Sequence, residues 1–172
     1  MRYGTTGRIA VLLAPSVADL EAPTVAECTA AKNLTPWMLR DGLKTPATGN
    51  TIDSSDAANR FTTTAPGTYG GDAGSFQGHR DSLLADDDAW TALAQDVTGV
   101  LIVFRSGCHQ NATTGLGTPD GAATAADRCE TYPFAVISRA MDDIAENQTS
   151  RFTASLAFIA PPVQDAAVVA GA

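Results

Sequence analysis

The segment GVLIVFR, residues 99–105, limits the possible folds more than any other part of the sequence. All residues from Val100 to Phe104 are apolar, so the segment has no polar face. A strand with two apolar faces must be covered on both sides, which predicts a central strand of a sheet. The chain has 172 residues, 44% of them hydrophobic, which suits one domain with a substantial core. We therefore expect a single domain over residues 1–172.

Other segments carry strand patterns as well. SRFTASLAFIA, residues 150–160, places Phe152, Ala154, Leu156 and Phe158 on one face and polar residues on the other, which is typical of a half-buried strand. Pro161 and Pro162 end that strand. Strands are also predicted over residues 7–14, 59–65, 74–81 and 131–139, with the turn PGTYGGD joining the second and third of these.

Helix signals are fewer. ADDDAWTALAQDV predicts a helix over residues 86–97, with Asp86–Asp88 at its positive N-terminus. Its apolar stripe should pack on a sheet through Trp90 and Leu93. Thr24 and Glu27 have the spacing of a capping box, which predicts a short helix from about Val25. The fold class expected is mainly β (α+β), with one flanking helix.

Three segments show no regular pattern. Residues 33–58 and 106–130 are expected to be long loops, and residues 161–172 a C-terminal arm rich in small residues. The apolar run Ile9–Ala14 is shorter than the core of a signal peptide and is interpreted as a first strand. No apolar run approaches the roughly 20 residues that span a bilayer, so stable membrane association is not expected.

The sequence offers little reactive chemistry. Cys108 and His109 are adjacent, and no C-x₂-C or H-x₃-H spacing occurs, so we expect no metal, no cofactor and no catalytic residue. Asp86–Asp88 lacks the alternating ligands of a calcium loop. Reduced thiols are the default for the three cysteines, although a disulfide between Cys108 and Cys129 across the long loop stays open. With 11 Lys and Arg against 19 Asp and Glu, the chain is poorly suited to gripping DNA.

An ordered series of short segments carries a family resemblance. It runs APTVAE, LTPW…DGL…TP, NTIDSSDAANRF, APGTYGGD, DDDAWTAL, GVLIVFR, CETYPFAVISR and RFTASLAFIAPP. In this order the segments resemble the tail tube (major tail) proteins of long-tailed bacteriophages, especially those that infect actinobacteria. The resemblance covers about residues 7–162. It departs from the family pattern at 106–130, where a short turn is usual.

The resemblance implies a β-sandwich or barrel-like domain and a structural role in the virion rather than an enzymatic one. Such proteins form hexameric rings that stack into a hollow tube, assembled in the host cytoplasm, through which DNA passes. The implied partners are other copies of the chain and the tape-measure, tail terminator and distal tail proteins. The net charge of −8 suits such a conduit, because a repulsive wall lets DNA slide.

Assembly contacts are expected from the segment 45–58, as an inter-ring loop, and from the C-terminal arm 161–172. The residues concerned are Trp37, Thr45, Pro46, Asn50, Asp53, Asp56, Arg60, Pro161 and Pro162. One alternative is a non-catalytic β-sandwich binding or virion-decoration module, which needs exposed aromatic residues and has few candidates beyond Trp37 and Tyr69. Another is a small hydrolase that uses an Asp with His79 or His109, although no recognisable constellation accompanies these residues.

Overall fold

Ten strands and two short helices make up the described part of the chain. The computed structural model describes residues 7–45, 47–53, 64–71, 73–81, 87–112, 114, 116–142 and 149–171. The strands are β1 (Ala10–Ala14), β2 (Lys32–Asn33), β3 (Met38–Lys44), β4 (Ala47–Asp53), β5 (Thr64–Gly71), β6 (Gly74–His79), β7 (Thr98–Phe104), β8 (Arg128–Met141), β9 (Arg151–Phe158) and β10 (Val163–Ala167). The helices are α1 (Val25–Ala30) and α2 (Asp88–Ala92).

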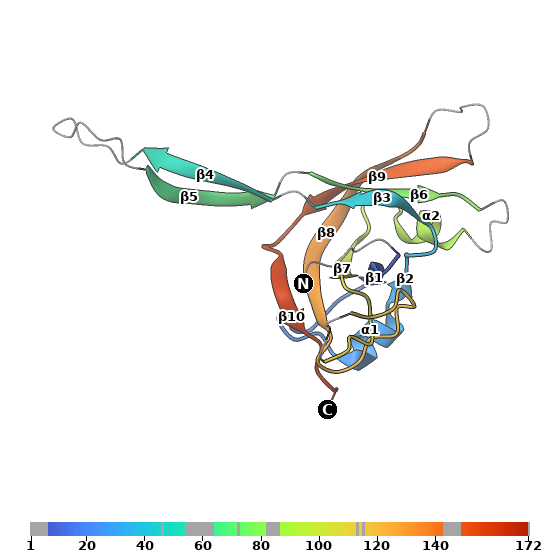
Figure 1. Ribbon diagram of the computed structural model, residues 1–172. Coiled ribbons are helices and arrows are strands. Elements are labelled where there is room, and N and C mark those ends of the chain that lie inside the picture. Colours follow the sequence, from blue (N-terminus) through green and yellow to red (C-terminus); the bar gives the residue numbers. More distant parts are fainter. Residues whose placement is uncertain are drawn as a thin grey trace.

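An eight-stranded antiparallel sheet folds over to form two layers. Its strand order is β2-β1-β7-β8-β9-β6-β3, and β10 pairs with β8 beside this path. The long strand β8 pairs with β7 through its first half and with β9 through its second half, and its register shifts between Val136 and Ser138. Such a bulge bends a strand, so one strand can serve both layers. In Figure 1, β9, β6 and β3 form an upper layer, and β1, β7 and the start of β8 form a lower layer.

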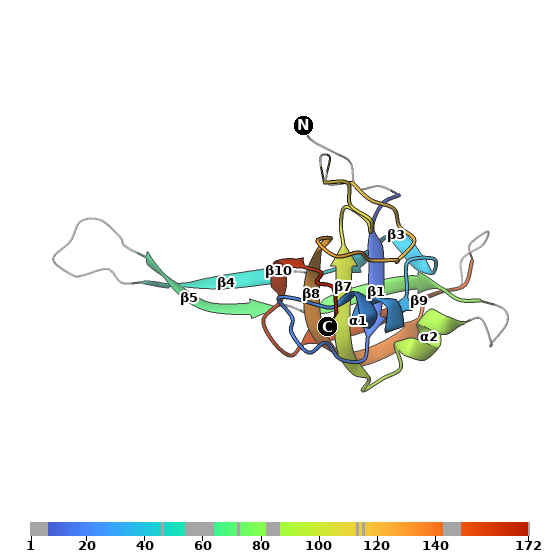
Figure 2. The same cartoon turned by 90° about the horizontal axis from the view of Figure 1, so that it is seen from below.

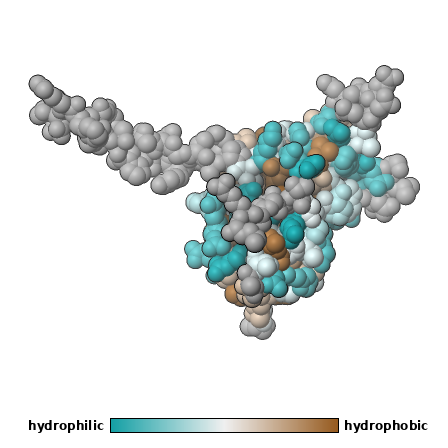
Figure 3. Space-filling model, viewed as in Figure 1, coloured by the Kyte–Doolittle hydropathy of each residue, from teal (hydrophilic) through white to brown (hydrophobic). Residues whose placement is uncertain are grey.

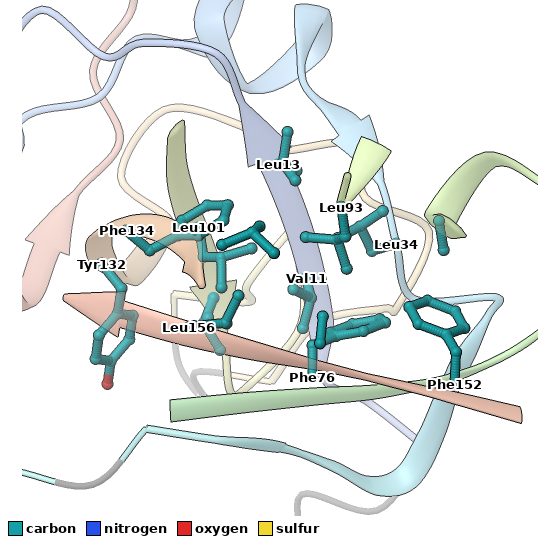
Figure 4. Packing of buried hydrophobic residues seen from close by; sticks show 14 residues of the cluster. Val11, Leu13, Leu34, Phe76, Leu93, Leu101, Tyr132, Phe134, Phe152 and Leu156 are labelled. Atoms are coloured by element: carbon teal, nitrogen blue, oxygen red, sulfur yellow. The ribbon is translucent and has the colours of Figure 1, made fainter. Parts of the chain in front are cut away.

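The first hydrophobic cluster fills the space between the two layers. It combines side chains of β1, β6, β7, β8 and β9 with residues around α2, and most of the side chains labelled in Figure 4 point toward one another. Phe76, Phe134, Phe152 and Leu156 in this cluster are fully buried. A mainly β fold with few helices is therefore confirmed.

The second cluster lies on the other side of β1 and β7. From β7, Leu101 and Val103 enter the first cluster, while Ile102 and Phe104 enter the second. This confirms the prediction of a central strand with two buried faces. The second cluster is closed by Cys28 of α1, by Cys108 and Ala123 of the β7–β8 connection, and by the C-terminal segment.

Helix α1 begins as the capping box predicts. The Thr24 Oγ1 accepts a hydrogen bond from the Glu27 backbone N–H at 3.2 Å, and the Glu27 carboxylate accepts one from the Thr24 N–H at 2.8 Å. These bonds satisfy donors that a helix N-terminus otherwise leaves free. Because the Glu27 carboxylate accepts bonds from the backbone of Thr24 and Ala18, its pKa is lowered.

Helix α2 is much shorter than the predicted helix over 86–97. Its N-cap residue Asp87 makes no side-chain cap, because its carboxylate instead accepts hydrogen bonds from the Arg80 side chain and the Asp81 backbone N–H. The chain leaves helical geometry at Leu93, which turns into the first cluster. A buried ion pair and core packing therefore override the helical propensity of the sequence.

Two sequence predictions about the region between α1 and β6 are wrong. The segment 33–58 is not a long loop, because β3 and β4 both lie within it, and the expected turn PGTYGGD forms most of β5 instead. Glycine, threonine and proline weaken the apparent strand pattern here, but pairing across the hairpin supplies the backbone hydrogen bonds. The strand at 74–81 is confirmed as β6, whereas 59–63 lie outside the described residues.

The C-terminal segment does not project as an arm. Strand β10 pairs with the beginning of β8, and Ala166 and Val168 are buried in the second cluster. Val169 also forms a parallel bridge with Thr24, beside the start of α1. Alternating small apolar residues thus fold residues 163–169 back onto their own subunit.

Candidate assembly surfaces

A two-stranded hairpin projects far beyond the body. Strand β4 follows β3 after two residues, and β5 leads into β6, so the β4–β5 pair continues the β3–β6 pair outward (Figures 1 and 2). We call β4 and β5 the arm. Its ladder runs from Ala47↔Gly71 to Asp53↔Thr64. The arm is thus an extension of the upper layer along its strand direction.

No third strand supports the arm among the described residues. An isolated two-stranded hairpin is at best marginally stable in water, and its outer edges carry unpaired N–H and C=O groups. Asp53 is the one charged residue in the sequence of either strand. A long, nearly uncharged hairpin with open edges is suited to contact with another chain.

A polar network lies at the base of the arm. Arg105 Nε donates to Glu130 Oε1 at 2.7 Å, and the Tyr132 hydroxyl donates to Glu130 Oε2 at 2.6 Å. Thr45, which leads from β3 toward β4, has its Oγ1 at 3.5 Å from both the Tyr132 hydroxyl and Arg105 Nη2. Hydrogen bonding to Glu130 raises the pKa of Arg105, whereas burial is the largest cause of the raised pKa of Tyr132. The network keeps Arg105 charged and Tyr132 neutral.

The outer face of the upper layer is mostly small and hydroxylated, and it also carries Lys44, opposite Ser75, and Arg151, opposite His79. Inward residues such as Phe152 and Leu156 alternate along β9 with Thr153 and Ser155, which are half-buried. On β6 and β8 the outward positions include Ser75, Gln77, Ser138 and Ala140. Figure 1 shows this face pointing away from the lower layer. In Figure 3 the body surface is mostly hydrophilic, with smaller hydrophobic areas.

The upper layer has two open edges within the described residues. Strand β3 pairs with β6 alone, and β8 beyond Val136 pairs with β9 alone. The β3 edge carries exposed Arg40, Asp41 and Lys44, and charges of this kind discourage uncontrolled strand pairing. The β8 edge carries Ile137 and Met141, each 50% exposed. These are two different edges, on opposite sides of one layer.

A family profile and several solved structures match this chain. The sequence profile of the family "Phage tail tube protein" matches residues 1–171. The chain belongs to the phage tail tube protein family. It is therefore a structural protein of a virion tail, and its family is one of tube components rather than enzymes. A search of curated protein sequences found no match to the chain.

Solved structures share this tail tube fold. A chain of the native gene transfer agent (GTA) virion is 12% identical, with a TM-score of 0.52 and coverage of 96% of this chain and 100% of that chain. A chain of the empty GTA tail, refined with C6 symmetry, is also 12% identical, with a TM-score of 0.51 and coverage of 96% of this chain and 100% of that chain. A chain of the six-fold symmetrised anti-feeding prophage (AFP) baseplate is 9% identical, with a TM-score of 0.53 and coverage of 95% of this chain and 97% of that chain.

The tail tube subunit places the expected contact residues in different surroundings. Thr45 lies at the base of the arm, and the backbones of Asn50 and Asp53 lie in β4. Trp37 is half-buried against the first cluster, so it serves the core of its own subunit. Pro161 and Pro162 lie between β9 and β10. Pro46, Asp56 and Arg60 lie outside the described residues.

Trp90 and Leu93 attach α2 to the body. Leu93 is fully buried, and the Trp90 ring meets Phe152 edge-on at 5.3 Å between centroids. The guanidinium groups of Arg80 and Arg139 lie 4.0 and 3.6 Å from the centre of the same ring, and Arg139 also donates to the Trp90 carbonyl. Desolvation, with repulsion from Arg80, lowers the pKa of Arg139. Asp87, almost fully buried, supplies the compensating charge.

The disulfide considered between Cys108 and Cys129 is absent, since all three cysteines are free and buried. Burial raises the pKa of Cys28 to about 11 and those of Cys108 and Cys129 to about 12. The thiols therefore act as small apolar side chains of the second cluster. Within the described residues, no group of three or more His, Cys, Asp or Glu could hold a metal ion. No helix of this part of the chain is long and apolar enough to cross a membrane.

No local sequence pattern indicates the two strands of the arm or the network at its base. The arm was hidden because its strands lack apolar alternation. Glu130 and Tyr132 are two residues apart on one strand and so share a face, while Arg105 follows the neighbouring strand. That spacing was the available signal for the network, but every strand contains it.

Proposed function

We propose that this tail tube protein forms hexameric rings that stack into a hollow tube, which conducts DNA into a host cell. The observation that carries the proposal is the combination of two open edges on one layer with an arm that continues the strands of that layer. The edges provide contacts within a ring, and the arm provides contacts between rings.

Within a ring, the β3 edge of one copy pairs with the β8 edge of the next. The two edges differ, so the contact is head-to-tail and generates a closed ring when the rotation closes. Pairing also removes the exposed edges of the monomer. The similar GTA chain comes from a tail refined with C6 symmetry, which supports six copies per ring.

Between rings, the arm reaches a neighbouring copy. Edge pairing extends the sheet across its strands, whereas the arm runs along them, so the two contacts have different directions. The seven residues of β4 span about 23 Å at about 3.3 Å per residue. This reach is large enough for the arm to lie on a subunit of the next ring.

The outer face of the upper layer forms the wall of the channel. Its threonine and serine side chains present neutral hydroxyl groups, and the chain as a whole carries a net charge of −8. Lys44 and Arg151 on this face lie opposite Ser75 and His79, four positions apart along β6. They do not form a cluster that would bind the phosphate backbone strongly, so DNA can slide past the wall. The tape-measure protein is expected in the same lumen, and the terminator and distal tail proteins at the two ends.

An arm deletion tests the inter-ring role. Replacing residues 47–71 with Asn-Gly, a favoured hairpin turn, should leave a folded subunit, because the β3–β6 pair keeps its contacts with β9. The far-UV circular dichroism spectrum of the variant should keep the β signal of the parent subunit, and its urea unfolding midpoint should equal that of the parent. Negative-stain microscopy should show rings or single subunits in place of tubes. Normal tubes from this variant would overturn the assignment.

Disulfide cross-linking tests the ring contact. Asp41→Cys on β3, combined with Ser138→Cys or Ala140→Cys on β8, should give oxidised ladders that end at six subunits. The native cysteines are buried and provide a low background. As a control, Asp41→Cys combined with Ala126→Cys, in the β7–β8 connection, should give no ladder. Equal ladders from the control, or none from either edge pair, would contradict the proposed pairing.

A further inference from the structure

The long hairpin, in which β3 continues into β4 and β5 continues into β6, has a third strand beside it only along its inner part. On the body side, Ser75 of β6 pairs with Lys44 of β3 and with Ser155 of β9, so three strands run together. The β9 partners of β6 end at Gly74↔Leu156. Beyond Lys44 and Gly74 the hairpin continues as two strands. This level is therefore where the arm can bend relative to the body.

The first strand of the hairpin meets Tyr132 at this level. Thr45 Oγ1 lies 3.5 Å from the Tyr132 hydroxyl, and Arg105 Nη2 lies 3.4 Å from that hydroxyl and 3.5 Å from Thr45 Oγ1. Figure 4 shows the Tyr132 hydroxyl at the outer tip of the ring, away from the other labelled side chains. Contacts of this length are individually weak, so they define a direction without clamping the strand.

The Tyr132 side chain is itself held rigidly. It is 3% exposed, and its hydroxyl donates to Glu130 at 2.6 Å. Glu130 also accepts from Arg105 Nε at 2.7 Å, so one carboxylate orients both groups that touch Thr45. Charge-assisted bonds of this length are the strong ones in proteins. The surface on which Thr45 rests is therefore preorganised.

The second strand of the hairpin rests on the neighbouring aromatic ring. A Cβ added at Gly74 would lie 2.7 Å from Phe158 Cζ and 2.8 Å from the Lys44 carbonyl oxygen. The Phe158 ring is 5.6 Å from the Tyr132 ring. Both strands of the hairpin thus leave the body over the Tyr132–Phe158 pair. Glycine permits this close approach, and a larger residue would lift the strand.

We infer that Tyr132, oriented by Glu130 and Arg105, is a positioning residue that sets the direction of the arm against the body. This adds to the proposed function a determinant of the twist between successive rings, and that second part rests on the proposed function. The arm acts as a lever: over about 23 Å, a rotation of about 10° at its base moves its end by about 4 Å. A displacement of that size changes which residues of a neighbouring subunit the arm meets.

Spin-label distances in the isolated subunit test the first part. Labels at Thr68→Cys on the arm and Ala126→Cys on the body should give one narrow distance distribution. Tyr132→Phe, which keeps the ring and removes the hydroxyl, should broaden that distribution or shift it by several Å. Gly74→Ala should shift it as well, by lifting the other strand. Unchanged distributions in both variants would overturn the inference.

A matched core variant separates positioning from general destabilisation. Phe152→Leu alters a fully buried ring of the first cluster that lies at the other end of β9 from Phe158, away from the base of the arm. It should lower the urea midpoint at least as much as Tyr132→Phe while leaving the distance distribution narrow. Equal broadening in Phe152→Leu would show that the arm responds to stability in general, and would overturn the role of Tyr132.

Microscopy of assembled tubes tests the second part. Tubes of Tyr132→Phe should show an altered or heterogeneous twist between rings. A changed arm distribution with the parent twist would overturn the link to ring geometry. If the parent chain forms no tubes, the proposed function fails, whereas the distance measurement on the subunit still decides the role of Tyr132.

Discussion

The inner and outer halves of the long hairpin have different surroundings. The inner half, β3 and β6, has β9 beside it and places Phe76 in the first cluster. The outer half, β4 and β5, has only its own ladder among the described residues. Strand pairing alone therefore does not distinguish a structural element from an assembly element. Burial against a third partner does, and under the proposed function the arm obtains such a partner from another copy.

The largest expected effect comes from removing the burial of the inner half. Phe76→Ala deletes a fully buried ring and should lower the free energy of unfolding by about 3–5 kcal/mol. Urea denaturation of the subunit measures this loss. Gln77→Ala, on the outward face of the same strand, is the control and should change stability by less than about 0.5 kcal/mol. A loss below about 1 kcal/mol for Phe76→Ala would place the core elsewhere.

A matched pair of prolines compares the ladders directly. Ser75→Pro interrupts a strand that is paired on both sides, and the lost hydrogen bond should cost about 1–3 kcal/mol of subunit stability. Thr68→Pro, in β5 of the arm, should leave the urea midpoint of the subunit unchanged and reduce tube formation. Equal destabilisation by the two prolines would show that the arm contributes to folding, and would contradict the view that only the inner half stabilises the subunit.

Alkaline pH should weaken the body through its buried thiols. Thiols ionise near the ordinary pKa of 9.0 in the unfolded chain, but those of Cys108 and Cys129 do so only near about 12 in the folded chain. Because the folded pKa values are raised, their contribution to stability is full below pH 9 and is lost as the pH rises toward 12. Urea midpoints between pH 8 and 11 measure the decline.

Cys129→Ala is the control for that decline. It removes one thiol whose ionisation opposes the folded state, so its midpoint should fall less steeply with pH than that of the parent. A slope identical to that of the parent would mean that other groups govern alkaline unfolding.

The smallest effect is expected at the start of α1, which lies at the opposite end of the body from the hairpin in Figure 1. Thr24→Ala removes the hydroxyl that accepts from the Glu27 N–H and should cost about 1 kcal/mol. Thr24→Ser retains the cap and should restore most of the loss in thermal unfolding. Neither variant should alter tube formation, and a defect in tubes from Thr24→Ala alone would implicate α1 in assembly.

The sequence predicted the body much better than the arm. Alternation in β9, the two-faced run in β7 and the capping box at Thr24 are local patterns that the fold satisfies directly. Strands β4 and β5 contain glycine, threonine and proline, whose strand character comes from pairing with each other and not from apolar periodicity. Their existence therefore depends on a contact between residues far apart in the sequence.

The remaining differences also arise from non-local contacts. Helix α2 ends early because Asp87 pairs with Arg80 and Leu93 turns into the core. The C-terminal segment docks because β8 offers an unpaired edge beside β10. Thr45 was expected at an assembly segment, but its neighbours Arg105 and Tyr132 are 60 and 87 residues away along the chain. No local pattern indicates such a meeting.

The uninterrupted passage from β3 to β4 and from β5 to β6 has a consequence for how such chains diverge. Adding two residues to each strand of the arm lengthens it by about 7 Å and leaves every side chain on its original face. Adding a single residue exchanges the two faces from that point outward. Insertions near the tip leave the pairs with β9 untouched, so the reach of the arm can change by mutation in discrete steps while the folded body is inherited unaltered.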